Sequence, residues 1–138
     1  KKIIWAITKK NPLKKKSTTS IKDRIKSCKN IIKSNKLIKV NFYEEIIRSN
    51  KTIDLINYLQ RKNKCEFYFL MGADNLINFH KWHKWKIISK KCKIIVFDRY
   101  GYKKKALNSV SFKRLNSNNL KFIKFNKVNI SSSQLRKI

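Results

Sequence analysis

The sequence predicts an α/β fold built on a parallel sheet, because short apolar runs alternate with segments of helical periodicity. Residues 3–7, 67–71 and 93–97 are the clearest runs, with the strand length and apolar content typical of buried parallel strands. Each is followed by a polar loop and then by an amphipathic segment. The sequence therefore predicts βαβ units with right-handed crossovers.

The first strand, residues 3–7, is expected to be buried, and the helix after it begins at a Ser-x-x-Asp capping box, Ser20 to Asp23. Its apolar residues share one helical face: Ile21, Ile25, Cys28 and Ile32. Residues 37–42 alternate apolar and polar side chains, which predicts a strand with one wetter face. A second helix is expected from residues 51–54, with Ile53 and Ile56 on its inner face.

Later elements follow the same alternation. Residues 67–71 form the next expected strand, and short helices are expected over residues 75–82 and 85–90. The strand at 93–97 leads into a loop at 98–102 and a variable polar stretch to about residue 119. Residues 120–125 form the last expected strand, and a Ser-x-x-Gln cap at 131–134 begins a last helix.

The length of 138 residues suits one domain with one core, and no linker or repeat interrupts it. We therefore expect residues 1–138 to form a single domain. The chain begins with Lys1, opens directly on an apolar strand and stops about one turn into its last helix. We expect an N-terminal truncation and a short C-terminal helix.

The net charge is +29, which raises the possibility of nucleic-acid binding. Of the 36 basic residues, 30 are Lys, whereas Arg makes the commonest specific base contact. The lysines are spread along the chain and accompany many Ile and Asn residues, a balance that A/T-rich codons produce. We favour a solvated basic surface with no specific nucleic-acid partner; a basic nucleic-acid-binding module is the alternative.

Cys28, Cys65 and Cys92 form no Cys-x-x-Cys pair, and an odd, dispersed set fits a reducing compartment. The longest apolar runs have about five residues, far below the roughly 20 needed to span a bilayer. No signal-peptide pattern is present. We expect a cytoplasmic protein with no membrane partner.

Polar clusters follow four of the expected strands, at residues 11–16, 72–74, 98–99 and 131–136. Loops after parallel strands meet at one sheet edge, where open α/β folds bind ligands. Cations, one acid and a helix N-terminus would suit a nucleotide there, because free N–H groups and the helix dipole attract phosphate. Arg136 has a planar fork that can clamp phosphate oxygens.

Each candidate has a purely structural alternative. Asp74 is as well explained by helix capping as by ligand contact. Trp82 and Trp85 are better explained as core than as a stacking wall. His80 and His83 are better explained as surface residues than as half of a zinc site, which needs three or four protein ligands. The serines at 131–133 are better explained as a helix cap than as a phosphate-binding site, although one arrangement can do both. No sequence pattern indicates a covalent nucleophile.

Five segments, at residues 5–14, 51–54, 69–85, 97–102 and 129–136, occur in an order that resembles the bacterial nicotinate-nucleotide adenylyltransferases. Two blocks are specific when they occur together. One is Gly-Ala-Asp-Asn-Leu from residue 72, running on to Phe79, Trp82 and Trp85, and the other is Ile-Ser-Ser…Arg at residues 130–136.

The resemblance implies a Rossmann-like, three-layer αβα fold of the nucleotidyltransferase type, here lacking its first strand. It also implies adenylyl transfer from ATP to nicotinate mononucleotide, with Mg²⁺, giving deamido-NAD and pyrophosphate in NAD biosynthesis. The mononucleotide phosphate attacks the α-phosphorus in line, so catalysis is positioning and charge neutralisation. A sister adenylyltransferase acting on nicotinamide mononucleotide or pantetheine phosphate is a further alternative.

Site residues are carried over from the resemblance in two sets. The ATP-binding set is Gly72, Asp74, Ser131, Ser132 and Arg136. Asp74 would contact the nucleotide ribose, Gly72 would let the backbone approach it, and the other three would hold ATP phosphates. The substrate-binding set is Lys14, Thr52, Trp82 and Arg99. Trp82 would stack on the nicotinate ring and Thr52 would bind near the pyridine carboxylate, while the two cations would hold the mononucleotide phosphate.

Three departures from the family pattern matter. The Gly-x-Phe-x-Pro-x-His-x-Gly-His loop is absent, so we assign no catalytic residue in this chain and expect little adenylyl transfer from these residues alone. Lys51 replaces the tyrosine of the family's Tyr-Thr pair, which weakens the case for Thr52. Tyr100 replaces the proline of Arg-Pro-Gly, which removes a residue that presets the loop backbone.

Overall fold

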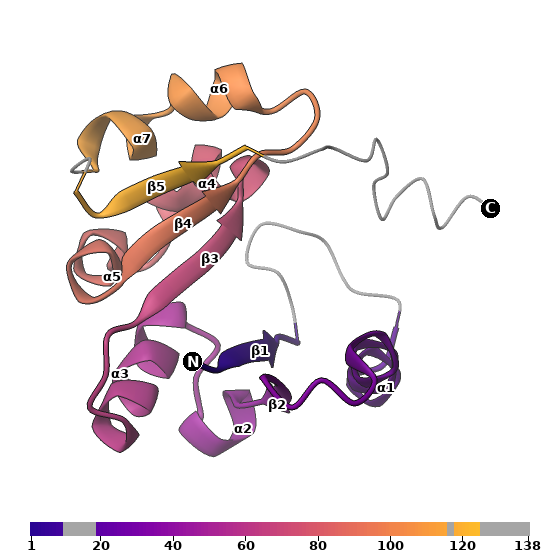
Figure 1. Cartoon of the computed structure of the whole chain (residues 1–138). Coiled ribbons are helices and arrows are strands. Elements are labelled where there is room, and N and C mark those ends of the chain that lie inside the picture. Colours follow the sequence, from indigo (N-terminus) through magenta and orange to yellow (C-terminus); the bar gives the residue numbers. More distant parts are fainter. Residues whose placement is uncertain (10–18, 116–117, 125–138) are drawn as a thin grey trace. The chain divides into compact units, whose positions relative to one another are not determined.

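The structure is a computed structural model that describes residues 1–9, 19–115 and 118–124. Its contacts divide the chain into two compact units, Lys1–Arg61 and Lys62–Ile138. Figure 1 labels the elements of both units, and each unit is described by itself below. The expectation of a single domain over residues 1–138 stays a prediction.

The first unit is built on two parallel strands, β1 (Ile3–Ile7) and β2 (Ile38–Phe42), paired from Ile3↔Ile38 to Ile7↔Phe42. Helix α1 (Ile21–Ile32) connects them and packs against both. The predicted N-cap at Ser20 is confirmed, because Ser20 Oγ accepts from the backbone N–H of Asp23 at 3.1 Å and donates to Asp23 Oδ2 at 2.6 Å.

The burial predicted for β1 is wrong for most of its length. Ile3, Ile4 and Trp5 are 46%, 37% and 38% exposed, and only Ile7 is buried. Within the described residues β1 has a paired strand on one edge only, so less of its surface is covered. Two helices complete the unit, α2 (Glu44–Ile47) and α3 (Thr52–Lys62), and α3 buries Ile53 and Ile56 as predicted.

The second unit is built on a three-stranded parallel sheet in the order β3-β4-β5, formed by Tyr68–Gly72, Lys93–Phe97 and Leu120–Ile123. Between β3 and β4 lie α4 (Ala73–Asn78), the 3₁₀ turn η1 (Phe79–Lys81) and α5 (Trp85–Lys91). Between β4 and β5 lie α6 (Lys103–Leu107) and α7 (Val110–Arg114). Parallel pairing in both units confirms the predicted α/β class.

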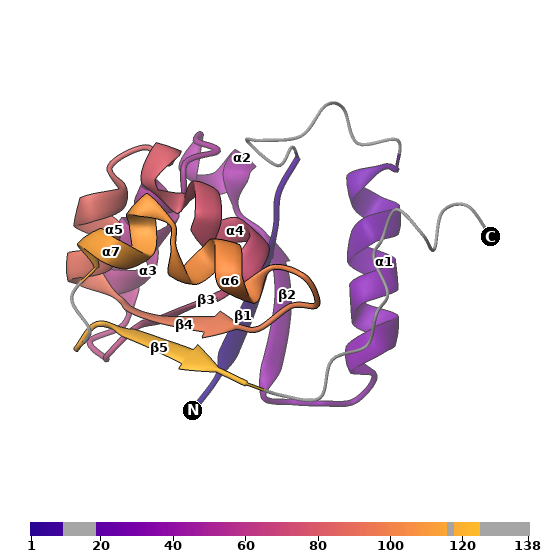
Figure 2. The same cartoon turned by 90° about the horizontal axis from the view of Figure 1, so that it is seen from above.

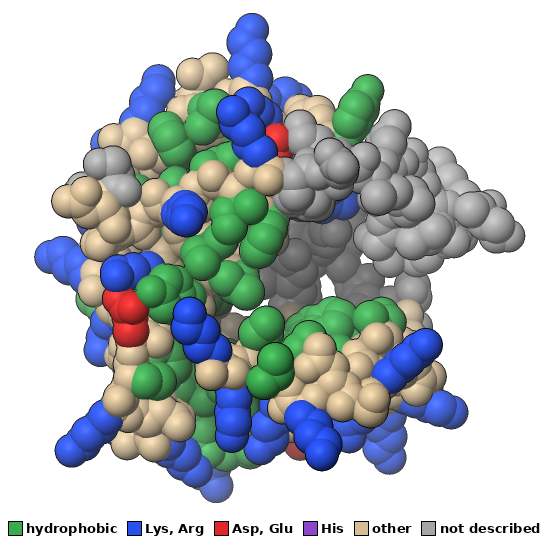
Figure 3. Space-filling view, viewed as in Figure 1, with side chains coloured by type: hydrophobic (Ala, Val, Ile, Leu, Met, Phe, Trp, Pro, Cys, Tyr) green, Lys and Arg blue, Asp and Glu red, His purple; other side chains and the backbone are tan. Residues whose placement is uncertain are grey.

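The helices α4, α5, α6 and α7 lie on one side of the three-stranded sheet (Figure 2). On that side the strands bury Met71, Ile94 and Val96, and the helices bury apolar side chains against them: Leu76, Phe79, Ile88 and Ala106. The opposite side is apolar but open. Tyr68, Leu70 and Phe97 are 52%, 43% and 37% exposed, and Figure 3 shows hydrophobic side chains gathered over these strands.

The polar stretch expected before the last strand is wrong in part, because it contains α6 and α7. Each has only five residues, too few to show an apolar periodicity. Ser109 caps α7 by accepting from the backbone N–H of Phe112 at 3.2 Å, while Ala106 and Ser111 are fully buried. Tertiary burial, rather than a helical pattern, maintains these two helices.

Candidate functional site

An ion pair between Asp74 and Arg99 marks the carboxyl edge of the β3-β4-β5 sheet. Gly72 and Phe97, the last residues of β3 and β4, are register partners. Asp74 and Arg99 each lie two residues beyond those partners, so the register brings them together. Arg99 Nη1 donates to Asp74 Oδ2 at 2.6 Å, a short charge-assisted hydrogen bond.

The loop after β4 holds Arg99 from its own backbone and from a neighbouring ring. The Arg99 N–H donates to Oδ1 of the buried Asp98 at 2.8 Å. The guanidinium carbon lies 5.7 Å from the centre of the Tyr102 ring, a cation–π arrangement. A 3.0 Å hydrogen bond from Tyr102 N to Arg99 O closes a turn in which Gly101 has a φ of 77°. This left-handed backbone suits glycine, so the turn forms although Tyr100 replaces proline.

A glycine is needed at position 72 because a side chain there would clash with a neighbour, not because the backbone conformation excludes other residues. Its φ of −79° is open to any residue. A Cβ atom there would lie 2.5 Å from Asp74 Oδ1, well inside van der Waals contact. The carboxylate of Asp74 therefore folds back over the α-carbon of Gly72, and a glycine at position 72 is what leaves it that room.

Asp74 is not the N-cap of α4, so the capping explanation of this residue is wrong, and its contact with a ligand stays a prediction. Gly72 is the N-cap of α4, and no side-chain hydrogen bond caps that helix. Asp74 lies in the first turn, where a carboxylate is favoured by the helix dipole, and points an oxygen at Arg99. The side chain of Asp74 is 27% exposed, so solvent and ligands can reach it.

Trp82 follows η1 and packs edge-on against two rings. Its ring centre lies 5.9 Å from that of Phe69 on β3 and 5.4 Å from that of Phe79. Trp85 also packs edge-on against Phe79, with the two ring centres 5.8 Å apart. Trp82 is half-buried, and its indole Nε1 is buried without a hydrogen-bond partner among the described residues. Trp82 therefore packs partly into the core, as the spacing of the aromatic residues predicted. Its indole nitrogen has no hydrogen-bond partner among the described residues.

A buried serine that the sequence reasoning missed fixes the turn before Trp82. Ser111 on α7 is fully buried, and its Oγ accepts from the backbone N–H of His80 at 2.9 Å. The same Oγ lies 3.4 Å from His80 Nδ1. His80 is therefore half-buried and bonded rather than a surface residue, whereas His83 is exposed. A serine inside a polar stretch gave no signal of this role.

Replacing Ser111 by alanine is expected to lower the free energy of unfolding by about 1–3 kcal/mol, because the His80 N–H would be buried without an acceptor. Chemical denaturation measures the change. Ser89→Ala is the matched control, since the hydroxyl of that half-buried serine donates to the carbonyl of Lys86 within its own helix. An equal loss in the two variants would contradict the role assigned to Ser111.

Five predicted site residues do not belong to the described part of the second unit. Thr52 is the first residue of α3 and is half-buried. Four candidates lie outside the described residues: Lys14, Ser131, Ser132 and Arg136. Gly72, Asp74 and Arg99 therefore form the part of the site that geometry defines, with Trp82 in the same unit.

Two of the three cysteines are held in the unreactive thiol form. Burial raises the pKa of the Cys92 thiol to about 11, and burial also raises the pKa of Cys28. Both thiols therefore stay protonated at neutral pH, whereas thiol nucleophiles work as thiolates. Over the described ranges, no group of three or more His, Cys, Asp or Glu side chains is placed to hold a metal ion.

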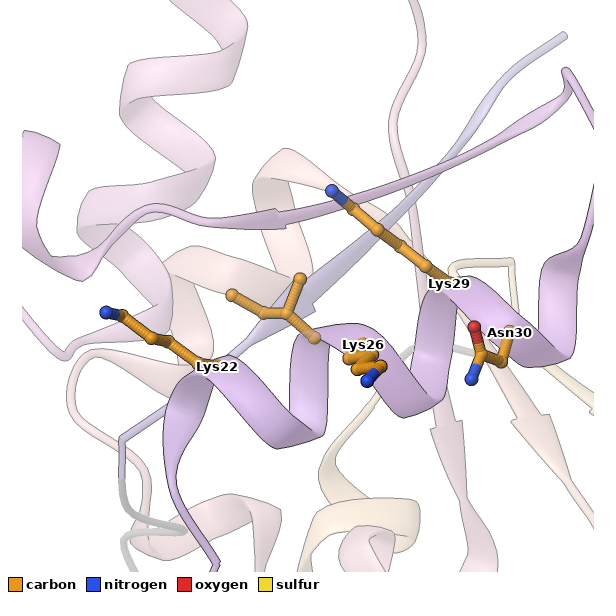
Figure 4. Close-up of a pocket in the computed structure, with 5 residues that line it drawn as sticks. Lys22, Lys26, Lys29 and Asn30 are labelled. Atoms are coloured by element: carbon orange, nitrogen blue, oxygen red, sulfur yellow. The ribbon is translucent and has the colours of Figure 1, made fainter.

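A shallow groove on α1 of the first unit is lined by Lys22, Ile25, Lys26, Lys29 and Asn30. Figure 4 shows its lysine side chains spread along the helix rather than converging on one point. Such a row of solvated lysines attracts polyanions without selecting among them. In the part of the chain that the structure describes, no helix is long and apolar enough to cross a membrane.

The class of protein follows from the whole-chain match and the fold. Residues 1–138 match the family described as cytidylyltransferase-like. The fold is similar to that of the Plasmodium falciparum nicotinic acid mononucleotide adenylyltransferase complexed with NaAD, with a TM-score of 0.69 at 19% identity. The match covers 99% of this chain and 68% of that one. At this identity the likeness concerns the fold, which is the Rossmann-like fold of nucleotidyltransferases.

Sequence relatives narrow the class. A Pelagibacter ubique protein named "Probable nicotinate-nucleotide adenylyltransferase" is 66% identical over 138 residues, covering 100% of this chain and 77% of the relative. Proteins of the same name from Agrobacterium fabrum and Aquifex aeolicus are 38% and 31% identical. Those matches cover 70% and 97% of this chain, and 52% and 83% of the relatives. The chain belongs to the nicotinate-nucleotide adenylyltransferase family, which confirms the resemblance seen in its motifs.

Proposed function

We propose that this protein transfers the adenylyl group of ATP to nicotinate mononucleotide, forming deamido-NAD and pyrophosphate in NAD biosynthesis. The observation that carries the proposal is the 66% identity to the Pelagibacter ubique relative over the full length of this chain. The Asp74–Arg99 pair at the carboxyl edge of a parallel sheet supports it, because open α/β folds bind nucleotides at that edge.

The reaction is a direct displacement at phosphorus. An oxygen of the mononucleotide phosphate forms a bond to the α-phosphorus of ATP while the bond to the pyrophosphate oxygen breaks. No covalent intermediate on the protein is needed, so the protein contributes position and positive charge. A carboxylate paired with a guanidinium, as at the described sheet edge, is suited to positioning of this kind.

The proposed roles use both described and undescribed residues. Asp74 accepts from a ribose hydroxyl, and Gly72 leaves room for the nucleotide beside it. Trp82 stacks its indole ring on the nicotinate, while Arg99 contributes charge for the mononucleotide phosphate. Thr52 is proposed near the pyridine carboxylate. Four further residues are proposed to hold phosphates. Lys14 would hold the phosphate of the mononucleotide. The phosphates of ATP would be held by Ser131, Ser132 and Arg136.

Mg²⁺ is proposed as a companion of ATP. The described residues do not form a protein cage for it, since they hold no group of three or more candidate ligands and Asp74 is engaged with Arg99. Magnesium bound with nucleotides is usually held through substrate phosphates and water, with one or two carboxylates. The triphosphate is therefore the proposed anchor, and no step above depends on the metal.

Calorimetric titration of the chain with nicotinate mononucleotide tests the proposal. Saturable binding is expected, and Trp82→Ala should weaken it by about 1–3 kcal/mol, the usual contribution of aromatic stacking on a ring. Tyr68→Ala is the control, because that ring lies at the amino end of β3 in the same unit, away from the carboxyl edge of the sheet, and is 52% exposed. Trp82→Phe keeps an aromatic face and should retain most of the affinity.

Each alternative gives a different result. No saturable binding, or equal binding by wild type and Trp82→Ala, would reject the pyridine site. A pyrophosphate-release assay with ATP then compares nicotinate mononucleotide with its amide and with pantetheine phosphate. Preference for one of the latter two would identify a sister adenylyltransferase. Steeply salt-dependent binding to DNA or RNA without nucleotide binding would favour a nucleic-acid module.

A further inference from the structure

We propose that Arg99 is a positioning and neutralising residue for Asp74, which lowers the repulsion between the Asp74 carboxylate and an anionic nucleotide. The inference rests on the proposed function and deepens it, because it assigns the arginine a role beyond direct contact with a phosphate. The guanidinium is engaged with a carboxylate in the structure, through a 2.6 Å hydrogen bond from Nη1 to Asp74 Oδ2.

The backbone fixes the direction of this contact. The backbone N–H of Arg99 donates to Asp98, and the backbone carbonyl of Arg99 accepts from the N–H of Tyr102. The guanidinium of Arg99 also lies over the Tyr102 ring. Asp74 is held in the first turn of α4, with its carboxylate over the α-carbon of Gly72. The first turn of α4 and the loop after β4 thus present the two groups to each other, and the contact does not depend on long flexible segments.

The local charge explains why the pair matters. The chain has only seven acidic residues against 36 basic ones, yet two of the acids, Asp74 and Asp98, lie at this edge. Both accept a hydrogen bond from Arg99. The substrates of the proposed reaction are multiply charged anions, which an unpaired carboxylate repels. Arg99 cancels the charge of Asp74 where those anions must approach.

This arrangement predicts a suppressor. Arg99→Ala leaves the Asp74 carboxylate without this partner and should weaken ATP binding roughly tenfold, the equivalent of losing one charged hydrogen bond. Asp74→Asn in the same chain removes the repelling charge while keeping an amide oxygen of similar shape. The double variant is therefore expected to bind ATP more tightly than Arg99→Ala alone.

The test compares wild type, Arg99→Ala, Asp74→Asn and the double variant by titration with ATP. Arg114→Ala is the matched control. Arg114 is an exposed arginine on α7, so this substitution removes the same charge from the same unit. Recovery of ATP affinity in the double variant, with little change in Arg114→Ala, supports the proposal. A double variant no tighter than Arg99→Ala overturns it, because direct phosphate contact gives that result.

A second measurement separates this proposal from the proposed function. The same four chains form a double-mutant cycle in the free energy of unfolding, which needs no nucleotide. A favourable coupling between Asp74 and Arg99 is expected, and its absence overturns the positioning role even if ATP binds. Coupling without any binding of ATP or nicotinate mononucleotide by wild type would instead reject the proposed function and the neutralising role with it.

Discussion

Replacing Phe79 by alanine is expected to lower the free energy of unfolding by about 3–5 kcal/mol, the range for removing a buried aromatic ring. Phe79 is fully buried and lies at the centre of the aromatic cluster, against both Trp82 and Trp85. Its loss removes apolar burial and leaves a cavity that two large rings cannot fill without shifting. A domain of ordinary stability has only about 5–15 kcal/mol to lose, so this is a large fraction.

Urea denaturation followed by circular dichroism measures the change. Tyr100→Ala is the control, because that ring is 60% exposed and its removal should cost little. The Phe79→Ala variant should also bind nicotinate mononucleotide more weakly, since Trp82 loses one of the two rings that orient it. A loss of stability no greater than that of the control would show that Phe79 does not centre the core of this unit.

In a chain to which the family's Gly-x-Phe-x-Pro-x-His-x-Gly-His loop segment has been added upstream of Lys1, replacing Gly72 by alanine is expected to lower the rate of adenylyl transfer by about a hundredfold. This is the scale of effect that a misplacement of about 1 Å has on a reacting group. The added Cβ would lie 2.5 Å from Asp74 Oδ1 and must push that carboxylate away. Stability should change little, because the backbone at Gly72 is open to alanine and a partly exposed ion pair contributes only about 0.2–1 kcal/mol.

Gly101→Ala is the informative comparison for Gly72→Ala. Position 101 has a φ of 77° and open space where a methyl group would be added, so alanine there strains the backbone without a clash. It should cost about 1–2 kcal/mol of stability, because L-residues disfavour this conformation. Pyrophosphate release and thermal unfolding measured on both variants separate the two effects. Full activity in Gly72→Ala would show that the position of Asp74 does not matter for transfer.

Much of the second unit could be predicted from local pattern. The apolar run ending at Met71 and the run ending at Phe97 indicated the two strands that carry the site, and their parallel pairing follows from the helices between them. The edge of the sheet that carries Asp74 and Arg99 could be predicted for the same reason. These conclusions need only the alternation of strands and helices, which is visible in consecutive residues.

The contact between Asp74 and Arg99 could not be predicted, because it depends on the register of β3 against β4. A shift of that register by one residue would separate the two side chains, and no local pattern specifies it. The roles of Ser111 and of the helix that carries it were missed for a related reason. A fully buried serine is recognisable only once the partner that satisfies it, the N–H of His80, is in place.

The shortness of the helices over the β3-β4-β5 sheet has a consequence for the stability of the Asp74–Arg99 pair. Helices α4, α6 and α7 have six, five and five residues, whereas isolated helices shorter than about 12–15 residues are marginal in water. None of them can persist as an independent unit in the folding of this chain, so they form and melt together with the strands that they cover. Asp74 lies in the first turn of α4, so the Asp74–Arg99 pair is expected to be lost in the same transition that unfolds the sheet.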